Sequence, residues 1–209
     1  MKMIIITLAL LAGGPVAPVE KAPVASAPVN VLVVGLDQER IASNYYPGSL
    51  IAEITGIPED SLATRFNRAI VDRLAGVTRG TARFIPLDGA ALPPGIVAHL
   101  RYEGEEESAR SDLSRVDGAD LSRLLDRFGA DYLLVMSRYY MKKEEEPFPY
   151  LYHIFNYEVY DRHKSRLHEG RACFDTPALL PAPRLDKHYR DLASRVASRV
   201  NKLVAARAK

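Results

Sequence analysis

Three β-prone runs follow one another between residues 130 and 175: ADYLLVMSRYYM (130–141), YLYHIFNYEVY (150–160) and RLHEGRACF (166–174). In the middle run, odd-numbered residues would point to one face of a strand and even-numbered residues to the other. Both sets contain aromatic residues, so this strand can be covered on both faces and paired on each side along its whole length. The stretch therefore predicts an antiparallel meander of three strands at the centre of a sheet.

The rest of the chain supplies strands and amphipathic helices around this meander. The run VNVLVVGL (29–36) is almost continuously apolar and β-branched, which is typical of a central strand covered on both faces. Residues 81–87 predict a short strand that Pro86 restricts to an edge or a strand end. Apolar residues at helical spacing predict helices over 58–75, 120–128 and 185–206, and a short helix from Pro94 to about Tyr102.

These elements predict an α/β (α+β) fold. We expect a single mixed sheet of about five strands, ending in the three-strand meander and packed by two or three helices. Residues 29–208 are enough for one domain of ordinary size that buries a full core.

The N-terminal segment, residues 1–27, has the pattern of an export signal. Lys2 precedes the apolar run Met3–Ala12, and a linker rich in proline and alanine follows. The run is shorter than the roughly 20 apolar residues that a membrane span needs. A secretory signal peptide is predicted, with an uncleaved anchor as the alternative, because Pro28 would follow the best cleavage site, Ala25–Ala27. Since no cysteine lies near the apolar run, we expect an exported, periplasmic or envelope-associated protein that is not a lipoprotein.

Composition argues against several classes of protein. The chain is 47% hydrophobic and 26% charged with a formal net charge of +2, so no overall field favours nucleic acid as a partner. The one cysteine, Cys173, excludes an intramolecular disulfide. Because it lies between Ala172 and Phe174 in a predicted strand, we expect it to be a small buried apolar residue.

Recognisable catalytic motifs are absent from the sequence. The five histidines show no metal-binding spacing, and there is no CxxC pair, phosphate-binding GxxxxGK[ST] loop or GxSxG elbow. We therefore predict no catalytic residue, no metal and no cofactor. The alternative is an acid/base or metal site on the predicted hairpin, formed by His153 and His168 with Glu158 or Glu169.

Two groups of tyrosines are candidates for binding a partner. Tyr45 and Tyr46 precede a Pro-Gly turn in the long connection 38–57, and Tyr150 and Tyr152 begin the middle strand of the meander. Long connections after central strands often carry function. An exposed sheet edge is a third way in which a partner could bind.

The predicted C-terminal helix has a basic face formed by Arg190, Arg195, Arg199 and Lys202. Such a face could contact anionic lipid, polysaccharide or nucleic acid, which would make the protein a peripheral membrane protein in the first case. The alternative is that these cations complement the helix dipole and keep the end of the chain solvated.

One part of the sequence resembles a family of bacterial envelope domains. The run GADYLLVM (129–136), followed by YEVYD (157–161), a short turn and RLHEG (166–170), is similar to the α/β domain of the curli secretion protein CsgG and the N-terminal domain of TolB. Those proteins have a GADYVV run at the end of a helix and a D-x-x-T-G turn before the next strand. Here the turn, DRHKSR (161–166), lacks the glycine. The resemblance implies a non-enzymatic role in the envelope and assigns a function to no individual residue.

The sequence thus predicts a secreted or periplasmic, envelope-associated binding or assembly protein whose partner is another envelope protein. The alternative is an envelope hydrolase or metal-dependent enzyme that uses the hairpin histidines and glutamates.

Overall fold

The main sheet of the protein has the strand order β3-β1-β6-β7-β8, and β2 pairs with β6 beyond the end of β1. The computed structural model describes residues 27–87 and 91–207, so the predicted export signal lies outside the described residues except for Ala27. The strands of this sheet are β1 Val29–Val34, β2 Ile41–Ser43, β3 Ala82–Leu87, β6 Tyr132–Glu144, β7 Tyr150–Tyr160 and β8 Arg166–Thr176. The predicted fold class is confirmed, with β2 as an additional short strand.

Strand directions make the sheet mixed. β1 pairs in parallel with β3 and with β6, whereas β6, β7 and β8 pair antiparallel as the predicted meander. Residues 31–34 of β1 are buried, as expected for a strand covered on both faces. β6 is longer than predicted, because it continues through the charged residues 142–144, where the sequence suggested a break.

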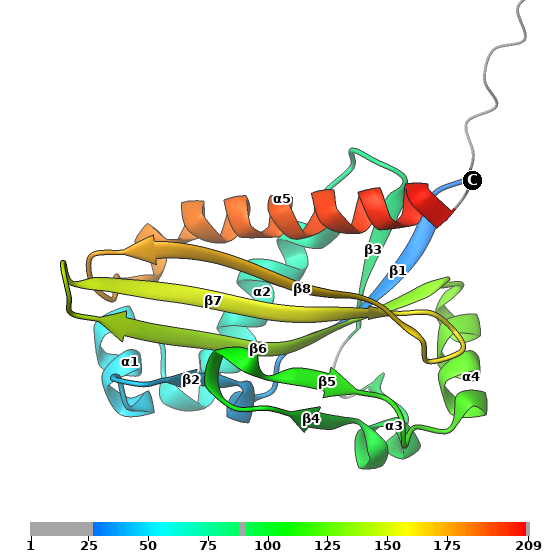
Figure 1. Cartoon of the computed structure of the whole chain (residues 1–209), viewed down its shortest axis with the longest axis horizontal. Helices are drawn as coiled ribbons and strands as arrows, with labels where there is room; N and C mark the ends of the chain where they lie inside the picture. The colour runs from blue at the N-terminus through cyan, green and yellow to red at the C-terminus, as the bar shows by residue number, and fades with distance from the viewer. Residues whose placement is uncertain (1–26, 88–90, 208–209) are drawn as a thin grey trace, which may run out of the picture.

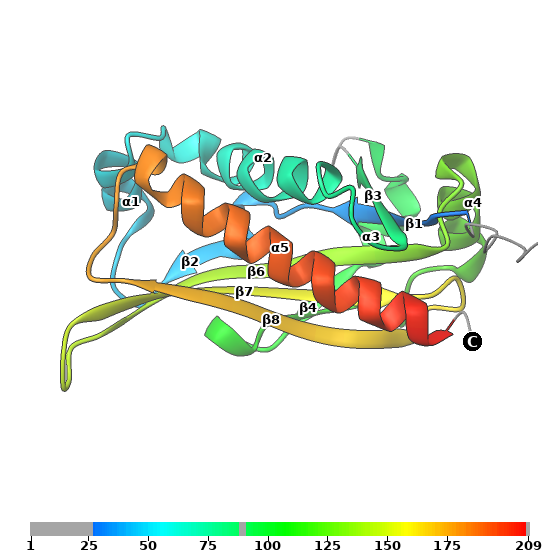
Figure 2. The same ribbon diagram turned by 90° about the horizontal axis from the view of Figure 1, so that it is seen from above.

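Helices cover both faces of this sheet, as Figure 2 shows from above. α2 and α5 lie together on one face, and α4 and α3 lie on the other (Figures 1 and 2). The helices are α1 Gly48–Thr55, α2 Leu62–Ala75, α3 Pro94–His99, α4 Gly118–Phe128 and α5 Ala182–Arg207.

Local sequence accounts for several helix ends. α2 begins four residues later than predicted, because residues 59–61 form a 3₁₀ turn after Pro58. α4 begins before the predicted Asp120, since the side chain of Asp117 accepts a hydrogen bond from Ala119 N and caps the helix. Gly129 ends α4 in the left-handed region at φ 57°, as the glycine after the predicted helix suggested.

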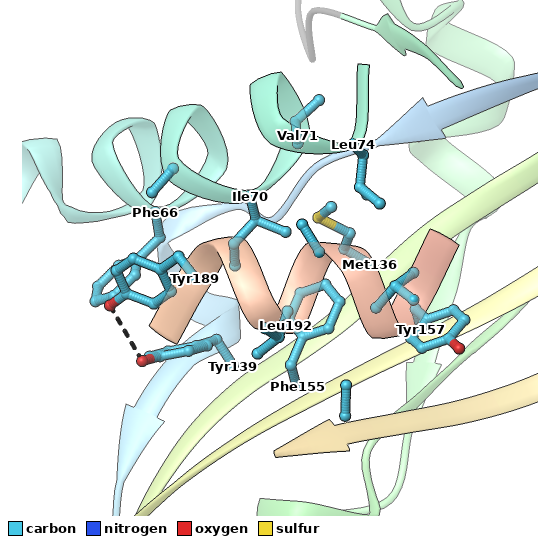
Figure 3. Close-up of a cluster of buried hydrophobic side chains, with 14 of the residues drawn as sticks. Phe66, Ile70, Val71, Leu74, Met136, Tyr139, Phe155, Tyr157, Tyr189 and Leu192 are labelled. Carbon is cyan, nitrogen blue, oxygen red and sulfur yellow. Dashed lines mark hydrogen bonds between the residues drawn. The ribbon is translucent and has the colours of Figure 1, made fainter. Parts of the chain in front are cut away.

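The larger core lies between the sheet and the pair α2 and α5 (Figure 3). Phe66 of α2 packs against Tyr139 and Tyr189, with ring centroids 4.5 and 5.8 Å away. Tyr157 of β7 lies over Gly170 of β8, where an added Cβ would be only 2.2 Å from the tyrosine ring. The cross-strand position therefore requires a glycine.

A small hairpin covers part of the opposite face. Its strands are β4 Arg101–Glu103 and β5 Arg110–Asp112, in a segment where the sequence predicted only a short helix from Pro94 to about Tyr102. That helix, α3, ends at His99, and the chain then turns back over β6 and β7. The hairpin is held there by polar side chains of β7, Asn156, Glu158 and Tyr160, which bind the backbone of Ala109 and Ser111.

One further expectation was wrong. Cys173 is exposed, because β8 is an edge strand whose buried face carries the alternating residues 170, 172, 174 and 176. The long connection 38–57 contains β2 and α1, and Ile51 of α1 is buried.

Candidate functional site

One end of the molecule carries most of the exposed large apolar side chains. The β6–β7 hairpin extends beyond the helices at this end, away from the start of β1 and the end of α5 (Figure 1). Among the described residues, four large apolar side chains are exposed: Tyr45 (53%), Phe148 (68%), Tyr150 (41%) and, elsewhere, Val97 (55%). We call residues 44–46 and 142–152 the hairpin end.

The two segments that carry the predicted tyrosines are neighbours at the hairpin end. β2 runs in parallel beside β6, with Ser43 opposite Met141. Asn44 then binds the backbone of Lys143 twice: its Nδ2 donates to the carbonyl oxygen at 3.1 Å, and its Oδ1 accepts from the amide nitrogen at 2.8 Å. The Lys143 ammonium lies 3.5 Å from the centroid of the Tyr45 ring, a cation–π contact. The segment before α1 is thereby fixed to the hairpin.

The four predicted tyrosines differ in the solvent exposure of their side chains. Tyr45 and Tyr150 are exposed, whereas Tyr46 and Tyr152 are half-buried. Tyr46 packs against the larger core, so it mainly holds the segment in place. Phe148, which sequence reasoning missed, is the most exposed of the group. The signal that could have found it is an aromatic residue between two prolines, Pro147 and Pro149, at the turn of a hairpin.

Charges at the hairpin end are largely paired. Lys142 lies 3.1 Å from Glu144 and 3.5 Å from Glu107, and Lys143 lies 3.1 Å from Glu145. The hydrogen bond with Glu144 raises the pKa of Lys142, so this ammonium stays charged. The hairpin end thus combines exposed rings with two lysines and three glutamates, four of which form two ion pairs.

The predicted basic face of α5 is only partly free. Arg195 Nη1 donates to the carbonyl oxygen of Cys173 at 2.8 Å, and Arg199 Nη1 donates to that of Arg171. Both carbonyls belong to β8, the last strand of the sheet. Arg190 and Lys202 are exposed and take part in none of the ion pairs found among the described residues.

The two end strands of the main strand order, β3 and β8, are partly blocked, which argues against partner binding at these two edges. At β8, two carbonyls already accept from the arginines of α5. At β3, Asn201 Oδ1 accepts from Ala82 N at 2.8 Å, and Pro86 has no N–H to offer. Blocked edges of this kind discourage the addition of a foreign strand.

The alternative acid/base site is not assembled. His153 lies opposite Phe174, and His168 lies opposite Val159, six positions further along β7, which corresponds to about 20 Å. Glu158 points to the other face of β7, where its carboxylate binds Ser111 and Ser137. Within the part of the chain that the structure describes, no group of three histidine, cysteine, aspartate or glutamate side chains could hold a metal ion.

His153 has a structural environment instead. Its Nδ1 lies 2.6 Å from Tyr139 Oη and its Nε2 lies 3.1 Å from Thr176 Oγ1, and its ring stacks on Phe174. Burial, with a smaller contribution from the charge of His188, lowers the pKa of His153 to about 3. The ring is therefore neutral and fully hydrogen-bonded at physiological pH.

Comparisons with known proteins give no assignment. No protein-family model matches the chain, and no curated protein matches its sequence significantly. Over the described residues, no helix is both long and apolar enough to cross a bilayer.

Three solved structures align with most of this chain at low identity. The hypothetical protein CT253 from Chlamydia trachomatis aligns with a TM-score of 0.49 and 15% identity, over 82% of this chain and 96% of its own. The PelC dodecamer from Paraburkholderia phytofirmans aligns with a TM-score of 0.36 and 10% identity, over 82% and 87% of the two chains. The lipoprotein GNA1162 from Neisseria meningitidis aligns with a TM-score of 0.31 and 14% identity, over 84% and 99%. None of the three is CsgG or TolB, so the resemblance drawn from the sequence stays a prediction, and likenesses this distant carry no argument about function.

Proposed function

We propose that this protein is an exported, envelope-associated binding or assembly module that engages another envelope protein through its hairpin end. The observation that carries the proposal is that three of the four exposed large apolar side chains among the described residues, Tyr45, Phe148 and Tyr150, belong to the segments of the hairpin end. The β6–β7 hairpin projects beyond the helices there (Figure 1). Export rests on the N-terminal signal predicted from the sequence.

Physical chemistry favours a protein partner for this end. Exposed aromatic rings are costly to leave in water, and aromatic residues that protein partners bury contribute much of the binding free energy at interfaces. The rim of paired charges fits the polar rim of a protein interface. Three consecutive glutamates, 144–146, lie beside the rings, and they would be repelled by an anionic membrane surface.

The proposal can be tested by removing the exposed rings. The variant Tyr45→Ser/Phe148→Ser/Tyr150→Ser, in the full chain with its own export segment, should fold but capture less of its partner from the cell envelope. Because the structure places all three rings outside the core, we expect little change in the free energy of unfolding.

The matched control is Val97→Ser, which removes an exposed apolar side chain away from the hairpin end. Proteins captured by both the unmodified chain and this control, but lost from the triple variant, identify the partner. If the triple variant retains the same bound proteins as the control, the hairpin end is not the binding site.

A further inference from the structure

A groove of about 700 Å³ lies between the loop after α2 and the C-terminal half of α5. It is at the opposite end of the molecule from the hairpin end, beside the first described residues, since Val29 N donates to the carbonyl oxygen of Thr81 in its wall. The predicted N-terminal segment therefore joins the domain next to this groove. The lining residues are Gly76, Val77, Thr78, Arg79, Gly80, Thr81, Ser194, Ala197, Ser198, Asn201, Lys202 and Ala205.

The charge of the lining is entirely positive. Arg79 lines the groove from the loop and Lys202 lines it from α5, and no aspartate or glutamate lines it. Neither cation is in an ion pair found among the described residues, in contrast to Arg73, which pairs with Asp186 at 3.3 Å. The hydroxyls of Thr78, Thr81, Ser194 and Ser198 add neutral hydrogen-bond donors. This set of groups suits a phosphate ester.

Apolar residues also line the groove, which makes its chemistry amphipathic. Ala197 is buried and Val77 half-buried, whereas Arg79 and Lys202 are exposed. A bare inorganic anion would use only the charged rim. An anionic headgroup that continues into an apolar chain would use both parts of the lining.

The loop wall is held in place by α5. Asn201 accepts from Ala82 N at 2.8 Å and donates to the carbonyl oxygen of Arg79 at 3.4 Å. Gly80 has a φ of 113° and lies so close to Asn201 that an added Cβ would be 2.3 Å from its Oδ1. A side chain at position 80 would therefore be both strained and obstructed, so the glycine lets the Arg79 loop close onto the helix.

From this combination we propose that the groove between the 76–81 loop and α5 binds the headgroup of an anionic phospholipid, with Arg79 and Lys202 contacting its phosphate. The site divides the basic face predicted from the sequence into two parts. Arg195 and Arg199 donate to carbonyl oxygens of β8, whereas Lys202 lines the groove together with Arg79. Binding there would place the hairpin end away from the bilayer. The inference does not depend on the hairpin end having a protein partner.

Co-flotation of the full chain with vesicles tests the proposal. Vesicles of phosphatidylcholine alone measure any insertion by the N-terminal apolar run, and vesicles that also contain phosphatidylglycerol measure the additional anionic binding. Arg79→Gln/Lys202→Gln should reduce the enrichment on anionic over neutral vesicles by roughly tenfold or more, as expected for the loss of two basic residues near an anionic surface. The control Arg101→Gln/Arg115→Gln removes two exposed charges from the other side of the sheet and should leave the enrichment unchanged.

A third variant, Ser198→Phe, fills the groove without changing the net charge and should also reduce anionic enrichment if the groove itself is the site. Each variant is checked for an unchanged unfolding midpoint. The proposal is overturned if both groove variants float like the unmodified chain, or if the control loses as much enrichment as Arg79→Gln/Lys202→Gln. It is equally overturned if anionic vesicles give no enrichment over neutral vesicles while inorganic phosphate raises the unfolding midpoint of the unmodified chain but not of Arg79→Gln/Lys202→Gln, because the ligand would then be a free anion.

Discussion

The two faces of β7 are both buried, but they are held by different interactions. On one face Phe155 and Tyr157 pack into the large apolar core under α2 and α5. On the other face Asn156, Glu158 and Tyr160 bind the backbone of the β4–β5 segment. Apolar packing is distributed over many neighbours, whereas the polar face depends on a few directional bonds.

Each face of β7 also contains one buried histidine or acid, His153 on the apolar face and Glu158 on the polar face. Folding stability should depend on pH in opposite ways through these two groups. Burial lowers the pKa of His153 on the apolar face to about 3. Burial also raises the pKa of Glu158 on the polar face, although hydrogen bonds from Ser111 and Ser137 act against this shift. In both cases the protein prefers the neutral form of the side chain.

The largest effect is expected from the apolar face. Phe155→Ala would leave a cavity among residues that are fully buried, so the free energy of unfolding should fall by about 3–5 kcal/mol. Phe148→Ala, which removes the same side chain at the exposed hairpin end, should change it by only about 0.5 kcal/mol or less. Urea denaturation followed by circular dichroism measures both. Equal losses for the two variants would contradict the arrangement of the core.

This contrast between faces explains what could be predicted from the sequence. The meander and its apolar face follow from the alternation over residues 150–160, because burial against helices leaves a periodic pattern. The β4–β5 cover leaves no such pattern. Its strands are three residues each and include the charged residues Arg101, Glu103, Arg110 and Asp112. The position of this hairpin is explained only by the structure, in which Glu158 and Tyr160 of β7 bind its backbone.

The structure of the hairpin end could likewise be predicted only in part from the sequence. Its tyrosines were identified by residue type and by their position in a long connection or at the start of a strand, and two of the four, Tyr45 and Tyr150, are exposed. Their assembly into one end depends on Asn44 binding Lys143, 99 residues away in sequence, beside a three-residue strand. Long-range contacts between short elements cannot be derived from local periodicity. Phe148 was missed because a single exposed aromatic residue in a proline-containing turn has no periodicity at all.

The polar face should give the next largest effect. Glu158 Oε2 accepts from Ser111 N at 2.9 Å and from Ser111 Oγ, and Oε1 accepts from Ser137 Oγ at 3.1 Å. Glu158→Leu would leave the buried Ser111 N–H without an acceptor and should cost about 1–3 kcal/mol. Hydrogen exchange in β5 should accelerate more than in the β6–β7 ladder, since the loss is confined to the cover.

The control for this variant is Glu169→Leu, the residue of β8 that lies opposite Glu158 in the register but is exposed. It should leave exchange in β5 unchanged. If both variants accelerate it equally, the bonds of Glu158 do not hold the hairpin.

Acid should lower the free energy of unfolding through the protonation of His153 on the apolar face. Because its pKa is lowered from 6.5 to about 3 on folding, the unfolded state binds the proton first as pH falls. Between pH 7 and pH 5 this linkage should remove about 2 kcal/mol of stability. His153→Leu is less stable at pH 7, because Tyr139 and Thr176 lose a partner, but it should lose less stability on acidification than the unmodified chain. Equal acid sensitivity of the two proteins would mean that folding does not lower the pKa of His153.

The smallest and most specific effect should come from Glu158→Gln. The amide oxygen of glutamine can take the place of Oε2 and accept from Ser111, while its amide group donates to Ser137 Oγ, so the hydrogen bonds of the hairpin are kept without a buried charge.

Since folding raises the pKa of Glu158, the unfolded state loses its proton first as pH rises above its ordinary value of 4.5. The folded state then binds more protons than the unfolded state, and stability falls with increasing pH until the folded carboxyl also ionises. The stability of the unmodified chain relative to Glu158→Gln should therefore be greatest in acid and decline toward neutral pH, a difference from which the titration of His153 cancels. Urea titrations of both proteins at a series of pH values measure it. If the stability of the unmodified chain relative to Glu158→Gln instead grows with pH, the serine hydrogen bonds lower the pKa of Glu158 by more than burial raises it. The folded state would then favour the charged carboxylate.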